Sequence, residues 1–254
     1  MNRLGKPIDI LVLPDSHAHP DYNNDRFTWF GKLAHDLKPD AIVNIGDLAD
    51  MASLCFHSKP GELEGARYKA DCDAAIDGQE RIFHELRKHK KKLPRMVWTL
   101  GNHDIRPARY VEQFPIFKGK IRNEDIGYED FPWEVYPFLE SMEINGVDFV
   151  HYATSGLMGR PIGGQHAAWT LIKKRNKSTV VGHSHVTDYK IDLSPGRSLM
   201  GLVCGSYIDY QAGYAGVAND MWSRGVAVLR NVHDGLFDLE WISLPRLKSA
   251  YSGN

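Results

Sequence analysis

Thr179-Val180-Val181-Gly182-His183-Ser184-His185 is the stretch that decides the fold of this sequence. A β-branched run that ends in glycine predicts a buried strand, and this strand delivers two histidines to the loop that follows it. Four upstream segments also follow an apolar run: Asp15-Ser16-His17, Gly46-Asp47, Gly101-Asn102-His103-Asp104 and His151. Five strands that each end in metal-binding side chains predict a metal site at the carboxyl ends of the strands.

The composition is typical of a soluble globular protein. The chain has 254 residues, of which 43% are hydrophobic and 25% charged, so it can bury a sizeable core. Because it contains no internal repeat, linker or low-complexity tract, we expect a single domain over residues 1–254. The net charge of −1 gives no reason to expect a nucleic-acid, membrane or acidic partner.

Cysteine usage and hydropathy predict the compartment. Cys55, Cys72 and Cys204 are scattered and odd in number, which does not indicate a disulfide framework and fits a reducing cytosol. No apolar run approaches the length of a membrane span, and the N-terminus lacks a signal-peptide pattern. We therefore expect a soluble cytoplasmic protein.

The first half of the chain reads as α/β. A strand over 8–13, a helix over 26–37 behind Asp25 and a strand over 41–45 form a βαβ unit with a parallel pair of strands. Residues 49–70 are irregular and predict a loop on the substrate side, in which His57 is expected to be an exposed loop histidine. A helix over 71–91, a strand over 96–100 and a short helix over 107–114 follow.

The second half is richer in short strands. Asn145-Gly146 predicts a tight hairpin within residues 143–149, and a helix is expected over 165–174. Further strands are predicted over 188–193, 199–207, 225–232 and 237–243, with a second hairpin turn at Asp234-Gly235. Trp169 and Trp222 are expected in the core.

The ligand types restrict the metal chemistry. Aspartate, histidine and asparagine side chains suit Mn²⁺, Zn²⁺, Fe or Ni²⁺, and the lack of cysteine ligands argues against a closed structural zinc site. A shared carboxylate is the usual means of holding two cations a few ångströms apart. Water that bridges two such ions is hydroxide near neutral pH, and the ion pair clamps a phosphoryl group during in-line displacement.

The five blocks in this order resemble the calcineurin-like metallophosphoesterases, whose signature is D-x-H, G-D, G-N-H-D/E, H and G-H-x-H. The blocks extend from residue 15 to residue 185, about two thirds of the chain. The resemblance implies a four-layer αββα sandwich of two packed mixed β-sheets flanked by helices, with the metal site at the strand carboxyl ends. Residues 186–254 would then complete the second sheet.

The resemblance also implies roles for individual residues. Asp15, His17 and His185 would hold the first metal ion, Asn102, His151 and His183 the second, and Asp47 would bridge the two. His103 would lie over the phosphate and protonate the leaving oxygen or stabilise transition-state charge, with Asp104 orienting its imidazole. The cofactors would be two divalent transition-metal ions, with Mn²⁺ preferred and Fe, Zn²⁺ or Ni²⁺ as alternatives.

Four further residues are candidates for substrate binding. His19 lies two residues beyond His17, although a simple loop histidine is an equal alternative. Arg106, Arg160 and Arg224 carry guanidinium groups that match phosphate oxygens, although surface or salt-bridging arginines are more common.

The substrate class stays open between two kinds of ester. The second block reads Gly46-Asp47-Leu48-Ala49-Asp50 and the third ends in Asp104, which departs from the serine/threonine protein phosphatases. Phosphodiesters (cyclic nucleotides, nucleotides or nucleic-acid ends) are therefore favoured over phosphomonoesters. A non-catalytic scaffold of the same fold is the remote alternative, because every ligand position is intact.

One further segment bears on the source. Residues 151–156 and 163–166 resemble small stand-alone family members found in bacteriophages and bacteria. A phage-encoded protein of this type would work in the host cytoplasm.

Overall fold

The computed structural model describes residues 6–56, 58–88 and 92–253. The strands are β1 Ile8–Leu13, β2 Ala41–Asn44, β3 Arg95–Thr99, β4 Glu134–Tyr136, β5 Met142–Ile144, β6 Val147–Phe149, β7 Thr154–Ser155, β8 Arg160–Pro161, β9 Ser178–Val181, β10 Thr187–Ser194, β11 Arg197–Cys204, β12 Gly225–His233 and β13 Leu236–Ser243. The α-helices are α1 Asp25–Leu37, α2 Tyr68–Arg87, α3 Arg106–Gln113, α4 Ala167–Arg175 and α5 Leu244–Tyr251. His57 and the end of the helix expected to reach Lys91 lie outside the described residues.

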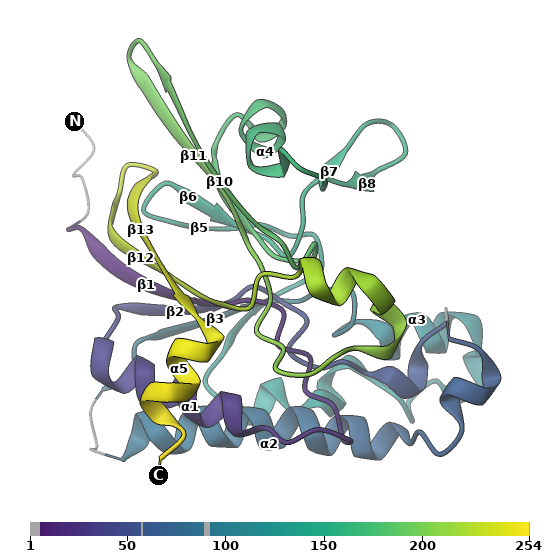
Figure 1. The fold of residues 1–254 in the computed structure, drawn as a ribbon. Helices are drawn as coiled ribbons and strands as arrows, with labels where there is room; N and C mark the ends of the chain where they lie inside the picture. Colours follow the sequence, from purple (N-terminus) through teal and green to yellow (C-terminus); the bar gives the residue numbers. More distant parts are fainter. Residues whose placement is uncertain (1–5, 57, 89–91, 254) are drawn as a thin grey trace.

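The strands form two mixed sheets (Figure 1). The first sheet has the order β13-β12-β1-β2-β3-β4, in which β1 to β4 are parallel, β12 is antiparallel to β1, and β13 is antiparallel to β12. The second sheet has the order β10-β11-β9-β6-β5, with β9 parallel to both β11 and β6. The carboxyl ends of β1, β2 and β3 in the first sheet and of β6 and β9 in the second lie on the same side of the molecule.

The expectation that residues 186–254 complete the second sheet is wrong for two of the four strands in this range. Strands β10 and β11 join the second sheet, but β12 and β13 extend the first one, with Leu11 opposite Val228. The physical reason is that β12 is apolar on both faces, so it fits an inner position of the first sheet. Val226 and Val228 face the helices, whereas Ala227 and Leu229 face the other sheet.

Alternation along β1 shows how the layers are stacked. Ile10 and Val12 point into the core between the sheets, where they meet Phe149 and Val180 of the second sheet. Leu11 and Leu13 point to the opposite face, which α1, α2 and α5 cover. On the outer face of the second sheet, α4 packs through Leu171 and neighbouring apolar side chains. The result is the expected αββα arrangement of two sheets between helices (Figure 1).

Both predicted hairpin turns adopt the backbone that their sequences require. Asn145 and Gly146 have φ angles of 47° and 83°, and Asp234 and Gly235 have 50° and 78°, as in a tight primed turn. The two turns also touch, since the Gly235 amide donates to the Asn145 carbonyl. This contact ties one sheet to the other at the end remote from the predicted ligands.

Among the helices of the described residues, none combines the length and the apolar character that crossing a bilayer needs.

Candidate metal centre

The predicted ligands meet in one buried cluster at the carboxyl ends of strands from both sheets. Asp15 and His17 follow β1, Asp47 follows β2, Asn102 and His103 follow β3, His151 follows β6, and His183 and His185 follow β9. Two groups of side chains in the cluster lie close enough to hold a metal ion, and they share Asp47: His17, Asp47 and His103, and Asp47, His151 and His183. In each group the possible ligand atoms lie within 4.8 Å of one another.

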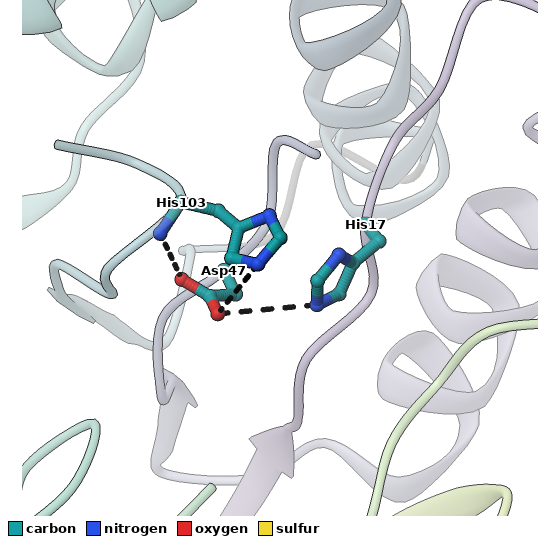
Figure 2. Close-up of side chains that lie close together, drawn as sticks. All are labelled: His17, Asp47 and His103. Carbon is teal, nitrogen blue, oxygen red and sulfur yellow. Dashed lines mark hydrogen bonds and ion pairs between the residues drawn. The ribbon is translucent and has the colours of Figure 1, made fainter. Parts of the chain in front are cut away.

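Figure 2 shows the first group, in which one oxygen of the Asp47 carboxylate faces both imidazoles. Oδ2 of Asp47 lies 3.9 Å from Nε2 of His17 and 4.0 Å from Nε2 of His103. Oδ1 accepts a hydrogen bond from the His103 backbone amide at 2.8 Å. These distances leave space between Asp47 and the two rings rather than direct hydrogen bonds.

In the second group, hydrogen bonding fixes which nitrogen of His151 faces the cluster. Nδ1 lies 2.9 Å from the Ile45 carbonyl oxygen, which can only accept, so Nδ1 carries the proton. Nε2 then faces Oδ2 of Asp47 at 3.2 Å and Oδ1 of Asn102 at 3.0 Å, and in the metal-free protein it donates its own proton to these two acceptors. A metal ion would replace that proton, while the Ile45 carbonyl keeps the ring in place.

Asp15 and His185 lie beside the first group. Nε2 of His185 is 3.6 Å from Oδ2 of Asp15, and Oδ1 of Asp15 is 3.5 Å from Nδ1 of His151. Oδ1 of Asp15 and Nε2 of His17 are both buried without a hydrogen-bond partner. Buried polar atoms without partners are costly, so these two atoms indicate positions that another group satisfies.

Burial and mutual charge shift the pKa values in the cluster strongly. Burial raises the pKa of Asp15 to about 7, and the Asp47 carboxylate adds to this shift. Burial opposes the charge on His151, but Asp47 and Asp15 outweigh it and raise the pKa of His151 to about 9. Burial lowers the pKa of His183 to about 4, helped by repulsion from His151. Such opposed shifts within one site are typical of functional centres.

The backbone of the cluster is strained. His17, Asp47, His183 and His185 have φ angles of 44°, 54°, 69° and 57° in the left-handed region, which non-glycine residues seldom adopt. Strain of this kind costs of order 1–3 kcal/mol per residue and persists where the surrounding structure enforces it. Here it turns four side chains toward a common centre.

Two motif glycines are required by the close approach of ligands. A Cβ atom on Gly101 would lie 2.0 Å from Oδ1 of Asp47, and one on Gly182 would lie 2.7 Å from Oδ1 of Asp15. The glycines therefore leave the space that the carboxylates of other blocks occupy.

Asp104 differs from its expected role. Its carboxylate accepts hydrogen bonds from the amides of Asp47, Ala49 and Gly101 at 2.8, 3.2 and 2.9 Å, and from the Trp98 indole at 3.1 Å. These four donors occupy the carboxylate, so the expectation that Asp104 orients the His103 ring is wrong. Asp104 instead holds the loops after β2 and β3 against each other.

Asp50 is the residue that contacts the His103 ring, and the sequence reasoning did not assign it. Its Oδ1 lies 2.9 Å from Nδ1 of His103 and 3.0 Å from Nδ1 of His17, and its backbone carbonyl oxygen also lies 2.8 Å from Nδ1 of His103. The two imidazoles outweigh the effect of burial and hold the pKa of Asp50 well below its usual range. The only signal in the sequence was its spacing, three residues after Asp47.

Two of the four candidate substrate residues lie against Asp50. Arg106 donates through Nη1 to the carbonyls of Asp50 and Met51, and its Nη2 lies 3.2 Å from Nε2 of His103. Nε2 of His19 lies 3.8 Å from Oδ2 of Asp50. Both side chains therefore lie at the edge of the cluster.

The other two candidates lie farther along the chain and have no described contact with the cluster. Arg160 is exposed on the β7–β8 ribbon. Arg224 lies beside Trp222, with Nη2 buried and without a hydrogen-bond partner. Trp222 is only half-buried and packs edge-on against His185, with ring centroids 4.3 Å apart. Trp169, also expected in the core, is 39% exposed on the surface of α4, where the Lys173 ammonium lies over its ring.

The donor set fits metal ions. Carboxylate, imidazole and amide groups converge, the orphaned atoms of Asp15 and His17 lie in the cluster, and Nε2 of His151 points at Asp47 and Asn102. Oxygen and nitrogen donors of this kind bind divalent transition metals.

Comparison with known proteins agrees with this geometry. No match was found among curated proteins. The profile of one family, calcineurin-like phosphoesterase, matches residues 8–210, which include every predicted ligand. We conclude that the chain belongs to the calcineurin-like phosphoesterase family of metal-dependent hydrolases.

Proposed function

We propose that this protein is a two-metal phosphoesterase that prefers phosphodiesters. The observation that carries the proposal is the pair of metal-binding groups that share Asp47. Two divalent cations, when bound, lower the pKa of water and neutralise charge on a phosphoryl group. We prefer Mn²⁺, with Fe, Zn²⁺ and Ni²⁺ as alternatives, because this donor set accepts all four.

For the ligands we propose the assignment that the family resemblance implies. Asp15, His17 and His185 belong to one ion and Asn102, His151 and His183 to the other, with Asp47 between them. Two features support this division: the unpartnered atoms of Asp15 and His17, and the hydrogen bond from Nδ1 of His151 to the Ile45 carbonyl, which points Nε2 at Asp47 and Asn102.

We place His103 on the substrate rather than on a metal ion. Its Nε2 lies near Asp47, but the Arg106 guanidinium is 3.2 Å from the same nitrogen. A cation at that distance repels a metal ion, whereas it attracts a phosphate oxygen. In this structure Nε2 of His103 accepts from Arg106, so it would take up a proton on its release from that contact before protonating the leaving oxygen.

Asp50 supports this proton transfer. By accepting from Nδ1 of His103, it fixes the ring orientation and stabilises the imidazolium that donates the proton. The same carboxylate orients His17. Asp50 thus links a proposed metal ligand to the proposed general acid.

The charge at the mouth of the cluster favours a diester. Arg26 is fully buried, donates to the carbonyls of Ser16 and His17 and pairs with Asp209. Arg106 uses Nη1 on carbonyl groups and Nη2 on Nε2 of His103, so neither arginine offers an unengaged cation. A diester carries one negative charge and a monoester two, so limited free positive charge suits the diester.

Two chromogenic esters test the substrate class. Metal-stripped protein resupplied with Mn²⁺ is assayed with bis(p-nitrophenyl) phosphate and p-nitrophenyl phosphate. We expect faster release from the diester, and preference for the monoester would identify a phosphatase of the same fold. If two metal ions bind and neither ester is cleaved, the chain is a binding scaffold and the proposal fails.

Two variants test the roles. His103→Ala should lower kcat by about 10²- to 10⁴-fold and keep its metal content, because it removes only the proton donor. Asp47→Ala should lose both activity and metal. Wild-type rates in His103→Ala would contradict the assigned mechanism.

We also propose that the protein works in the cytoplasm. Within the described residues the buried Cys72 and Cys204 are thiols that form no disulfide, as a reducing compartment maintains them. A phosphate ester, including a nucleotide or nucleic-acid diester, is the proposed partner.

A further inference from the structure

A pocket with aromatic walls opens beside the metal centre. It has a volume of about 280 Å³, near the lower end of the range for small-molecule sites. Tyr22, Tyr210 and Tyr214 form its walls, and Ala52 and Gly213 leave room between them. His19 and Asp50 line the side that faces the cluster. Because Asp50 also holds His103, the pocket adjoins the place where the ester would be cleaved.

Tyr210 is a fixed part of this wall. Its hydroxyl donates to the His17 carbonyl at 2.9 Å, and its ring is almost wholly buried. The Tyr22 ring lies parallel to it, with centroids 3.9 Å apart, and remains 40% exposed. The outer face of this stack is therefore a flat surface that a ligand can reach.

Tyr214 belongs to a loop that is anchored at the metal centre. We call it the Ser206–Ser223 loop; its ends join where the Ser206 amide donates to the Ser223 carbonyl and the Ser223 amide to the His185 carbonyl. In its middle, the buried Asn219 side chain bonds both backbone groups of Ala212 at 2.9 Å. The loop is thus held in shape without a ligand. In Figure 1 it is the yellow-green segment between β11 and β12.

Tyr214 lines the pocket together with Asp50 and Gly213, and the residue is 60% exposed. Its ring is available for stacking.

The charges of the lining define the ligand. Among the described residues that line the pocket there is no lysine or arginine, and Asp50 is engaged by two imidazoles. A second phosphate would therefore find no counter-charge here. Tyrosine rings and the Ser58 hydroxyl suit an uncharged flat group with hydrogen-bonding edges.

We propose that this pocket binds the nucleobase of a nucleotide-type phosphodiester, with the phosphate at the metal centre. The inference rests on the proposed function and specifies its substrate class. Stacking on tyrosine and hydrogen bonding at the ring edges are the means by which proteins hold unpaired bases.

Adenosine tests the pocket apart from hydrolysis, because it has no phosphate. Mn²⁺-loaded protein is titrated calorimetrically with adenosine and with 1-O-methyl riboside, which has the sugar without the base. We expect saturable binding of adenosine and binding of the riboside at least tenfold weaker. Equal affinities would overturn the inference.

Variants of the walls make the test specific. Tyr22→Ala and Tyr214→Ala should each weaken adenosine binding about tenfold, the scale of one stacking contact, whereas Tyr22→Phe should keep most of it. Trp169→Ala is the matched control, because Trp169 is as exposed as Tyr22 but lies on α4 away from the pocket. Adenosine affinity that is unchanged in both tyrosine variants would also overturn the inference.

Hydrolysis separates this inference from the proposed function. Thymidine 5′-(p-nitrophenyl phosphate) and methyl p-nitrophenyl phosphate share a leaving group and differ in the base. We expect a KM at least tenfold lower for the nucleoside ester, and a ratio near one in Tyr214→Ala. If both esters are cleaved with equal KM, the base pocket fails and the phosphodiesterase stands. If neither is cleaved, the phosphodiesterase fails.

Discussion

Asp50 shows at the scale of one residue how a carboxylate outside the ligand set can control a metal centre. It accepts from Nδ1 of both His17 and His103, so it fixes the direction of two Nε2 atoms. Groups that orient metal-binding histidines change metal affinity or activity by about 10- to 100-fold when they are removed.

Asp50→Asn should therefore lower kcat/KM by about 10- to 100-fold without unfolding the protein, because the amide keeps the shape of the side chain and loses the charge. Steady-state kinetics on bis(p-nitrophenyl) phosphate, with metal content measured in parallel, check this. Asp73→Asn, which changes an exposed ion pair on α2, is the control and should match wild type. An Asp50→Asn enzyme with full activity would show that neither imidazole needs the carboxylate.

The convergence of the proposed ligands could be predicted from sequence because each lies in a loop that follows a buried strand, and parallel strands of a sheet end at the same edge. The contacts of Asp104 and Asp50 could not be predicted in this way. Both carboxylates lie within a few residues of the cluster, and the choice between them depends on loop conformations with positive φ angles, such as that of Asp47. Propensity says little about such strained backbone.

At the scale of elements, the loop after β3 must pass very close to the loop after β2. In Gly101→Ala the new Cβ atom would need the space of Oδ1 of Asp47, 2.0 Å away, so the shared carboxylate must move. We expect Mn²⁺ affinity to fall at least tenfold, with a loss of about 1–3 kcal/mol in the free energy of unfolding.

Calorimetric Mn²⁺ titration and thermal unfolding measure these effects. Gly163→Ala is the matched control, because nothing lies within 4 Å of its Cβ position, and it should change stability by less than about 0.5 kcal/mol. Equal behaviour of the two variants would show that the crowding at Gly101 is relieved without moving Asp47.

Element type was easier to predict from the sequence than element placement. The expected strand over 8–13 has the bounds of β1, because Pro7 and Pro14 flank its apolar run. The edge strand β4, which has only three residues, is not predicted from the sequence, and neither is α5, whose second residue is Pro245. Which sheet receives β12 depends on long-range packing, which no local pattern contains.

At the scale of the whole molecule, the cluster couples protonation to stability. His151 has a pKa of about 9 in the folded, metal-free protein against an ordinary value of 6.5. A raised pKa of this kind stabilises the fold fully below pH 6.5, and the contribution is lost as the pH rises toward 9, by about 3 kcal/mol at most.

Thermal unfolding with EDTA should therefore show a falling Tm between pH 6.5 and pH 9. With saturating Mn²⁺ the fall should disappear, because Nε2 of His151 then binds metal instead of a proton. Melting curves across this range, with and without metal, measure the difference. The same slope in both series would mean that His151 is not a ligand.

We propose that the chain forms one domain, because the core between the sheets draws side chains from β1 as well as from β9 and β12. A chain shortened to end at residue 210, where the family match ends, would lack β12 and β13.

The pairing of β1 with β12 has a consequence for synthesis. Ile8 lies opposite Val232, so one edge of β1 stays uncovered until β12 has been synthesised and has paired with it. While the chain is still emerging from the ribosome, the backbone amides and carbonyls along that edge have no partner and can pair with another chain. Contacts between such distant residues also form slowly. Between translation of β1 and release of β12, we therefore expect this edge to be open to aggregation and a place where a chaperone can bind.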